Sequence, residues 1–291
     1  MTKSDIGGQS LGGRKAHCSD AQGQVKRRFL TLLGLLLLPA LGWAEALDQA
    51  HQNHLTDMAT YYRNALRGEE VVELNAAGEP FLGLWLEQRT GTPQGGILLL
   101  HDQGHNPDWP FRLQQARSYL PDVGWSTLSI ALPRTPDDRT DADFDSLTMA
   151  RVNAGIDRLI QEGQLNLVLL GYGEGAYWAA RYLAVAGPAP ENFGYALMMV
   201  DATPNRADLP GLIGQLQVPV LDLVFDDGNW AKRNARERKA EAARNQLENY
   251  LLIEDAPDGT FLGEPNPSRT TRRLWGWLRS NAAGQEVDVK P

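Results

Sequence analysis

Residues 165–183 have the sequence LNLVLLGYGEGAYWAARYL, in which an apolar run, three alternating glycines and a second, mostly apolar segment follow one another. The run at 165–170 is short and ends at a glycine, which is typical of a buried β-strand. The segment at 176–183 is long enough to form a helix, and the glycines permit a sharp turn before it. The stretch predicts strand, tight turn and helix, the unit from which mostly parallel α/β sheets are built.

The glycines of this turn match a catalytic motif at every fixed position but one. Gly171, Gly173 and Gly175 have the spacing of G-x-S-x-G, the nucleophile elbow of α/β-hydrolases, with Gly173 in place of the serine. In those enzymes the histidine of the triad follows the serine along the chain. All histidines here precede the turn: His17, His51, His54, His101 and His105. The sequence therefore predicts the fold without the nucleophile and base of its chemistry.

The rest of the chain fits this fold. Residues 45–68 have apolar side chains at helical spacing and predict an N-terminal helix, followed by an α/β-hydrolase-like domain at 69–282 and a polar tail at 283–291. We expect strands at 71–74, 81–87, 96–100, 126–132, 165–170, 195–200, 218–225 and 250–253, and helices at 111–119, 147–161, 176–183, 209–216, 230–248 and 269–281. This order predicts a mostly parallel central sheet with an antiparallel N-terminal start, helices on both faces and no lid domain.

The first 44 residues have the layout of a secretory signal peptide. Lys26, Arg27 and Arg28 precede a Leu-rich run at 29–38, and Gly42 and Ala44 supply small residues before a cleavage site. The run is shorter than the roughly twenty residues of a membrane-spanning helix, so we expect no stable membrane anchor after cleavage. An uncleaved anchor and export by the twin-arginine route stay open. The leader predicts a periplasmic protein.

Charge and cysteine content narrow the possible partners. The chain has a formal net charge of −8, and cleavage after Ala44 would leave 22 basic against 34 acidic residues, a net charge of −12. Such a chain is a poor binder of nucleic acid. Cys18, the one cysteine, would leave with the leader, so disulfides and thiolate metal ligands are not expected. We expect no metal and no cofactor, and an unknown small ligand or an envelope protein as partner.

Three segments carry a resemblance to known proteins: residues 98–110 (LLLHDQGHNPDWP), residues 124–130 and residues 171–180. Together they resemble an uncharacterised bacterial family of secreted α/β-hydrolase-like proteins over roughly residues 70–280. The resemblance implies that His101 and Asp102 stand in the oxyanion loop. It further implies that the backbone N–H groups of Gln103 and Glu174 form the oxyanion hole.

The resemblance also implies the triad positions. Gly173 stands for the nucleophile, Asp226 or Asp227 for the acid, and Gly259 for the histidine. Because the nucleophile and the histidine are both replaced, the resemblance puts hydrolysis itself in doubt. Asp226 and Asp227 then serve better as turn and helix N-cap residues.

One alternative keeps the chain an enzyme. His101 and Glu174 could form an acid-base pair that activates water in an esterase-like hydrolase. A structural His101 bonded to loop backbone is the simpler interpretation, because no nucleophile accompanies the pair. Candidates for a cleft at the carboxyl edge of the sheet are His101, Asp102, Gln103, His105, Tyr172, Gly173, Glu174 and Gly259.

Three further features have a functional and a plain interpretation. Residues 171–176 also match the dinucleotide pattern G-x-G-x-x-A, with Asp201 after the next strand, although the motif belongs on the first βα unit and lies here on the third. The aspartates at 137–145 could ligate calcium, but they lack the glycine and final Glu of a calcium loop and fit a solvated loop before the next helix better. The helix at 230–248 has a basic face that is either solvated or docks an acidic partner.

Asp222, inside a predicted central strand, needs a partner that the sequence does not identify.

The sequence thus predicts an exported α/β-hydrolase-fold protein that lacks the Ser and His of the triad and serves in binding or in envelope assembly. A hydrolase that uses His101 and Glu174, and a dinucleotide binder, are the alternatives.

Overall fold

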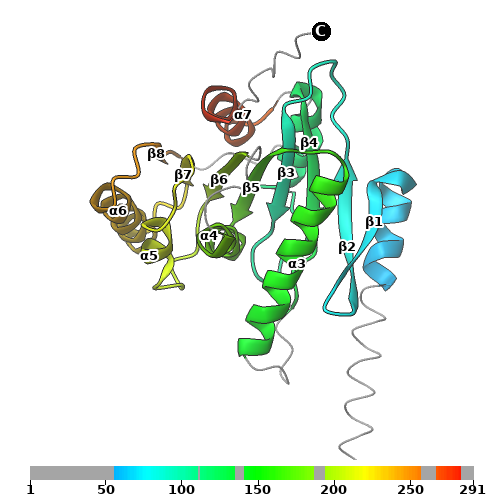
Figure 1. The fold of residues 1–291 in the computed structure, drawn as a ribbon, viewed down its shortest axis with the longest axis horizontal. Coiled ribbons are helices and arrows are strands. Elements are labelled where there is room, and N and C mark those ends of the chain that lie inside the picture. Colours follow the sequence, from blue (N-terminus) through cyan, green and yellow to red (C-terminus); the bar gives the residue numbers. More distant parts are fainter. Residues whose placement is uncertain (1–55, 111, 135–140, 187–193, 257–266, 283–291) are drawn as a thin grey trace, which may run out of the picture. The chain divides into compact units, whose positions relative to one another are not determined.

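The computed structural model describes residues 56–110, 112–134, 141–186, 194–256 and 267–282. Eight strands form one mixed sheet in the order β1-β2-β4-β3-β5-β6-β7-β8 (Figure 1). They are β1 (Val71–Ala76), β2 (Glu79–Leu86), β3 (Gly95–Leu100), β4 (Trp125–Ile130), β5 (Asn166–Tyr172), β6 (Gly194–Val200), β7 (Val220–Val224) and β8 (Tyr250–Glu254). Strand β2 runs antiparallel to both β1 and β4, and the other neighbours are parallel. The antiparallel start and the parallel remainder confirm the predicted sheet.

Helices cover both faces of this sheet. They are α2 (Gln114–Tyr119), α3 (Asp141–Gln161), α4 (Glu174–Ala186), α5 (Leu209–Ile213), α6 (Asn229–Arg244) and α7 (Arg269–Asn281), with 3-10 turns η1 (Gly68–Glu70) and η2 (Leu120–Val123). Helices α3, α4, α5 and α6 contribute to one core layer, and α2 and α7 to the other. Residues 56–65 are helical and form the described part of the expected N-terminal helix. None of the described helices is long and apolar enough to cross a membrane.

The core explains why the strands are apolar throughout. In β3, Leu98 and Leu100 belong to the α3–α6 layer, whereas Ile97 and Leu99 belong to the α2–α7 layer. All four side chains are fully buried, as expected where helices cover both faces of parallel strands. The parallel strands β3, β5, β6 and β7 therefore all end at one edge of the sheet, and the loops that follow them are brought together there.

Helix α3 begins earlier than predicted. It starts by Asp141, not at residue 147, and Asp141 and Asp143 lie in its first turn, where carboxylates favour the helix dipole. Asp145 pairs with Arg181 of α4 at 2.6 Å. Much of the predicted aspartate loop is thus helical, and its other residues lie outside the described part of the chain. Within the described residues no group of three or more His, Cys, Asp or Glu side chains could hold a metal ion.

Asp222 of β7 has the partner that the sequence left open. Arg238 of α6 donates to both of its carboxylate oxygens, from Nε at 2.8 Å and from a terminal nitrogen at 3.0 Å. The hydroxyl of Tyr250 in β8 donates to the same carboxylate at 2.5 Å. Arg238 and Asp222 are almost completely buried, so the pair neutralises two charges that would otherwise be costly in the core.

Candidate functional site

The predicted elbow forms the turn between β5 and α4. Gly173 has a φ of +59°, a left-handed conformation that favours glycine, and α4 begins at the next residue. Gly175 is required by close packing, since a Cβ there would lie 2.6 Å from the carbonyl carbon of Leu100. The strand, turn and helix of a nucleophile elbow are therefore all present, with Gly173 at the position where G-x-S-x-G has its serine.

The side chain of Asp102 fills the space above this elbow. Its Oδ1 accepts hydrogen bonds from the backbone N–H of Gln103 at 2.9 Å and from that of Glu174 at 2.7 Å. These are the two N–H groups that the resemblance assigned to the oxyanion hole. A Cβ on Gly173 would lie 2.6 Å from the Cβ of Asp102 and closer still to its carboxyl group. The Asp102 carboxyl group thus accepts from both N–H groups and occupies the space that a side chain at Gly173 would need.

His101 is a structural residue in this geometry. Its Nε2 accepts from the backbone N–H of Leu132 at 2.9 Å, so the ring proton lies on Nδ1, which donates to the carbonyl oxygen of Asp102 at 2.7 Å. Burial lowers the pKa of His101 to about 4 from its ordinary value of 6.5, so the ring is neutral at neutral pH. Both ring nitrogens are occupied by backbone groups, which ties the loop after β3 to the end of β4.

Glu174 has a different partner from the one the catalytic alternative requires. Its carboxylate accepts two hydrogen bonds from Arg206, one of them from Nε at 2.8 Å. The guanidinium of Arg206 lies over the rings of Tyr177 and Trp178, at 4.7 and 5.1 Å from their centroids. With His101 bonded to backbone and Glu174 to Arg206, this geometry argues against the His101–Glu174 pair.

The second histidine of the loop is the one that faces Asp102. Nδ1 of His105 lies 4.0 Å from Oδ2 of Asp102. Its ring stacks on Trp109 at a centroid distance of 3.7 Å and lies parallel to the ring of Tyr172 at 5.7 Å. The rings of Trp109 and Tyr172 thus hold His105 beside the carboxylate of Asp102.

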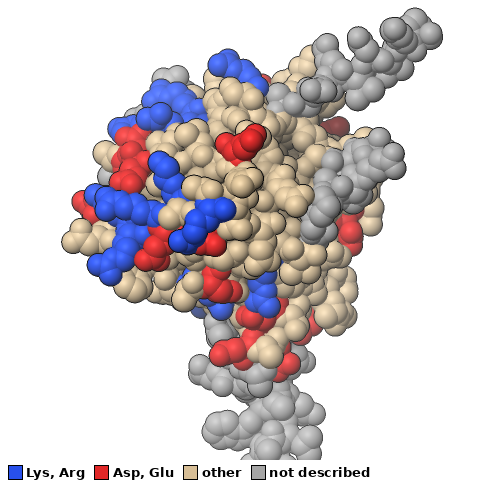
Figure 2. Space-filling view, turned by 60° about the vertical axis from the view of Figure 1, so that its left-hand side comes forward, with Lys and Arg blue, Asp and Glu red and all other residues tan. Residues whose placement is uncertain are grey.

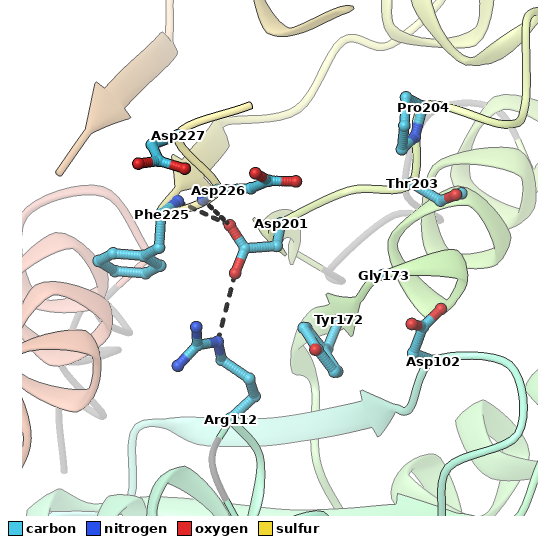
Figure 3. A pocket seen from close by; sticks show the side chains of 10 residues that line it. All are labelled: Asp102, Arg112, Tyr172, Gly173, Asp201, Thr203, Pro204, Phe225, Asp226 and Asp227. Atoms are coloured by element: carbon cyan, nitrogen blue, oxygen red, sulfur yellow. Dashed lines mark hydrogen bonds and ion pairs between the residues drawn. The ribbon is translucent and has the colours of Figure 1, made fainter. Parts of the chain in front are cut away.

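The loops after β6 and β7 are joined by Asp201. Its Oδ1 accepts from the backbone N–H of Phe225 at 2.6 Å and of Asp226 at 3.0 Å, and its Oδ2 accepts from Nε of Arg112 at 3.3 Å (Figure 3). Asp201 adopts a left-handed conformation with a φ of +45°, which suits an aspartate that bonds to nearby backbone. The carboxylate that the dinucleotide interpretation would use is therefore engaged in holding the two loops together.

Asp226 and Asp227 lie at the predicted acid position directly after β7. Asp226 accepts from the backbone N–H of Gly228 at 2.8 Å, a turn arrangement before α6. Both aspartates are exposed. Gly259, the position implied for the histidine, lies outside the described residues.

A cavity of about 390 Å³ lies over the carboxyl ends of β3, β5, β6 and β7. It is lined by Asp102, Arg112, Tyr172, Gly173, Asp201, Thr203, Pro204, Phe225, Asp226 and Asp227. In Figure 3 Asp102 lies beside Gly173 and Tyr172 on one side, and Arg112 and Asp201 face each other on the other. Of the predicted cleft residues Asp102, Tyr172 and Gly173 line it. The other lining residues are Arg112, which precedes α2, and residues directly after β6 and β7, positions that the strand ends in the sequence could have indicated.

The sheet order, the crossover helices and the turn at Gly173 define an α/β-hydrolase fold. Solved structures agree with this class. A dienelactone hydrolase from Anabaena variabilis has a TM-score of 0.55 at 18% identity, and the match covers 73% of this chain and 97% of that one. An esterase from Pyrococcus furiosus has a TM-score of 0.55 at 12% identity, with 73% and 92% covered. A cold-adapted esterase from an Arctic intertidal metagenomic library has a TM-score of 0.55 at 16% identity, with 73% and 93% covered.

The family follows from the sequence. Residues 41–146 and 136–280 match the family described as protein of unknown function DUF3530, and the chain belongs to that family. A search among curated proteins found no match. At these low identities the solved structures share the fold with this chain, and their names describe their own activities.

Proposed function

We propose that this protein binds a small ligand in the cavity above the elbow and does not hydrolyse it. The observation that supports this most strongly is the position of Asp102. A tetrahedral intermediate of acyl transfer develops its negative charge at the oxyanion hole. Here the N–H groups of Gln103 and Glu174 already hold a carboxylate oxygen. An oxyanion there would have to displace one negative charge in order to place another.

The absence of a serine at position 173 and of a histidine after it supports the same proposal. Gly173 has no hydroxyl, and no histidine follows it anywhere in the sequence. A serine hydrolase needs nucleophile, base and oriented acid together, because the triad acts as a unit. The fold and the cavity can persist without them, since they depend on packing.

The walls of the cavity indicate the kind of ligand. Asp226 and Asp227 are exposed at its rim, and Arg112 is engaged by Asp201. Tyr172 and Phe225 add aromatic surface. Carboxylates repel anions and aromatic faces attract organic cations, so a neutral or cationic ligand suits this cavity better than an anionic one.

The proposed place of action is the periplasm. It rests on the leader-like sequence at 1–44, which lies outside the described residues, and on the acidic charge of the remaining chain. The sequence has no cysteine after Cys18, so the exported chain would have no thiol that an oxidising compartment could convert to a disulfide.

The catalytic half of the proposal is tested with p-nitrophenyl acetate and p-nitrophenyl butyrate. The rate with the wild type should equal that with the heat-denatured protein. The binding half is tested by thermal unfolding with benzyltrimethylammonium and with benzoate, two aromatic probes of opposite charge. The first should raise the melting temperature more than the second. An Asp226→Asn, Asp227→Asn variant should lose this difference, whereas Glu69→Gln, Glu73→Gln, which changes the charge equally elsewhere, should keep it.

A second candidate function has one specific observation in its favour. Asp102 and His105 face each other at the elbow at 4.0 Å, and a histidine oriented by a carboxylate is a common general base. In a hydrolase of this kind His105 would activate water directly. Turnover of either ester that His105→Ala abolishes and His101→Gln does not would favour this function over the ligand-binding one.

A further inference from the structure

We propose that β8 and α6 form a docking surface for an extended acidic segment of another protein, which joins the sheet as an additional strand. This surface lies at the last strand of the sheet and shares no residue with the cavity above the elbow.

The edge of the sheet at β8 is open among the described strands, because β8 pairs with β7 alone. Val220 of β7 donates its N–H to the carbonyl oxygen of Asn249 at 2.8 Å, and Asp255 donates to that of Val224 at 3.0 Å. Backbone groups alternate between the two sides of a strand, so Leu252 and Glu254 direct their N–H groups away from β7. Such a row of unpaired groups is a template for an added strand.

Helix α6 supplies positive charge beside this edge. It carries six basic and two acidic residues, in a chain with a net charge of −8. Lys232, Arg236 and Lys239 are spaced by four and three residues and therefore share one stripe of the helix. The ion pairs of α6 in the described structure use Arg238 and Arg244 instead. Figure 2, which brings the α6 side forward, shows Lys and Arg side chains gathered there with acidic ones between them.

The position of Glu241 shows which way this stripe faces. Its side chain lies toward the end of α5, because a Cβ on Gly214 would be 3.0 Å from the Cγ of Glu241. At 100° per residue, the stripe lies roughly opposite Glu241 on the helix. The three cations therefore point away from α5, toward the end of the sheet where Figure 1 shows α6 and β8 outermost.

The buried pair described above fixes the helix to the edge. Arg238 joins α6 to Asp222 of β7, and Tyr250 joins β8 to the same carboxylate. These bonds fix the position of the α6 cations relative to the outward N–H groups of β8. A surface that is ordered before binding loses less entropy on association than one that must be ordered by its partner.

The two faces of β8 specify the pattern of the partner. Tyr250 bonds to Asp222 on the α6 face, so Leu252 and Glu254 share that face. Leu251, which is 45% exposed, and Ile253 lie on the α7 face. An added strand would place alternate side chains beside the cations of α6 and the others beside Leu251. Acidic and apolar residues in alternation fit both faces.

A second copy of this chain fits the surface less well. Pairing β8 with β8 of another copy would bring the two α6 helices, each with a surplus of positive charge, close to each other. Like charges at an interface are unfavourable and select against the wrong partner. The charge of α6 thus favours an acidic segment from a different protein.

The test uses the full chain and a fluorescein-labelled peptide of alternating Val and Glu, followed by fluorescence anisotropy. The wild type should bind this peptide and not the matching Val-Lys peptide. Arg236→Glu with Lys239→Glu should weaken binding at least about tenfold. Arg63→Glu with Arg67→Glu makes the same change in net charge on the helix at 56–65 and just after it, and should leave binding within about twofold.

A second pair of variants tests strand addition itself. Glu254→Pro removes an outward N–H from an exposed edge position, whereas Glu254→Ala keeps it. Both remove one negative charge, so charge alone would raise the affinity of both for the acidic peptide. Strand addition predicts that only the proline variant loses binding. The proposal is overturned by a wild type that does not bind, by equal effects of the two charge-reversal pairs, or by equal binding of the two Glu254 variants. Binding to phosphatidylglycerol vesicles but not to the peptide would assign the surface to a membrane and would also overturn it.

Discussion

The carboxyl group of Asp102 lies in the space where a side chain at Gly173 would have to begin. An ideal Cβ on Gly173 would come within 2.6 Å of the Cβ of Asp102. The two residues belong to different strand ends, after β3 and after β5, and each makes the other possible. A glycine leaves room for the aspartate, and the aspartate satisfies two N–H groups that would otherwise face an unfilled hole.

This relationship predicts that Gly173→Ser alone lowers the free energy of unfolding by at least about 2 kcal/mol. The serine would have to adopt the left-handed backbone conformation of Gly173, and its side chain would clash with Asp102. Adding Asp102→Gly should recover at least about 1 kcal/mol of that loss, measured by urea unfolding. Gly175→Ser is the control, since its clash is with the backbone of Leu100 and Asp102→Gly cannot relieve it. Strictly additive effects of Gly173→Ser and Asp102→Gly would show that the two side chains do not clash.

Removal of the Asp102 carboxylate should expose an anion site. In Asp102→Ala the N–H groups of Gln103 and Glu174 are free to bind acetate, with the start of α4 adding its dipole. Titration with acetate should shift these two amide signals in a nitrogen–proton NMR spectrum of the alanine variant. The wild type and Asp102→Asn, which both keep an acceptor oxygen in place, should not respond. Equal shifts in all three proteins would mean that Asp102 does not block the site.

His101 predicts a pH dependence of stability. Its pKa in the folded protein, about 4, lies below the ordinary value of 6.5, so the unfolded chain takes up a proton in this window that the folded chain does not. Its contribution to stability is therefore lost as the pH falls from 6.5 to 4, by about 3 kcal/mol. His101→Gln should remove this part of the slope while carboxylates contribute equally to both proteins. Identical slopes would show that His101 titrates normally.

The buried Asp222 and Arg238 should depend on each other. Asp222→Asn leaves Arg238 without its countercharge in the core and should destabilise the protein by about 3–5 kcal/mol. The combined change Asp222→Leu, Arg238→Met, Tyr250→Phe, Asn234→Ala also removes Asn234, which accepts from Arg238. Because it removes all four polar partners together, it should cost less than Asp222→Asn alone. Urea unfolding of the three proteins measures this. A larger loss in the combined variant would indicate that the polar network itself, and not its completeness, stabilises α6.

The fold was accessible from the sequence because its signals are local. Apolar runs bounded by glycine marked the strands, and the glycines at 171–175 marked the turn. The start of α3 was missed because its first turn is acidic and polar, and the partner of Asp222 was missed because Arg238 lies 16 residues away on a helix that appeared merely basic.

The site was harder to predict because it depends on contacts between loops. The resemblance implied that the N–H groups of Gln103 and Glu174 line an oxyanion hole, but not that Asp102 accepts from both. It also gave no sign that Asp201 would connect the loops after β6 and β7 to Arg112. Such contacts join residues 72 and 89 positions apart, and the spacing of apolar residues along the sequence does not indicate them.

We expect that the elbow holds no reactive nucleophile. Intact-mass spectrometry of the folded wild type after incubation with a fluorophosphonate tests it most directly, with a serine esterase as positive control. We expect no mass increase in this protein under conditions that label the esterase completely. Addition of one phosphonyl group to the native protein, absent after denaturation, would contradict it.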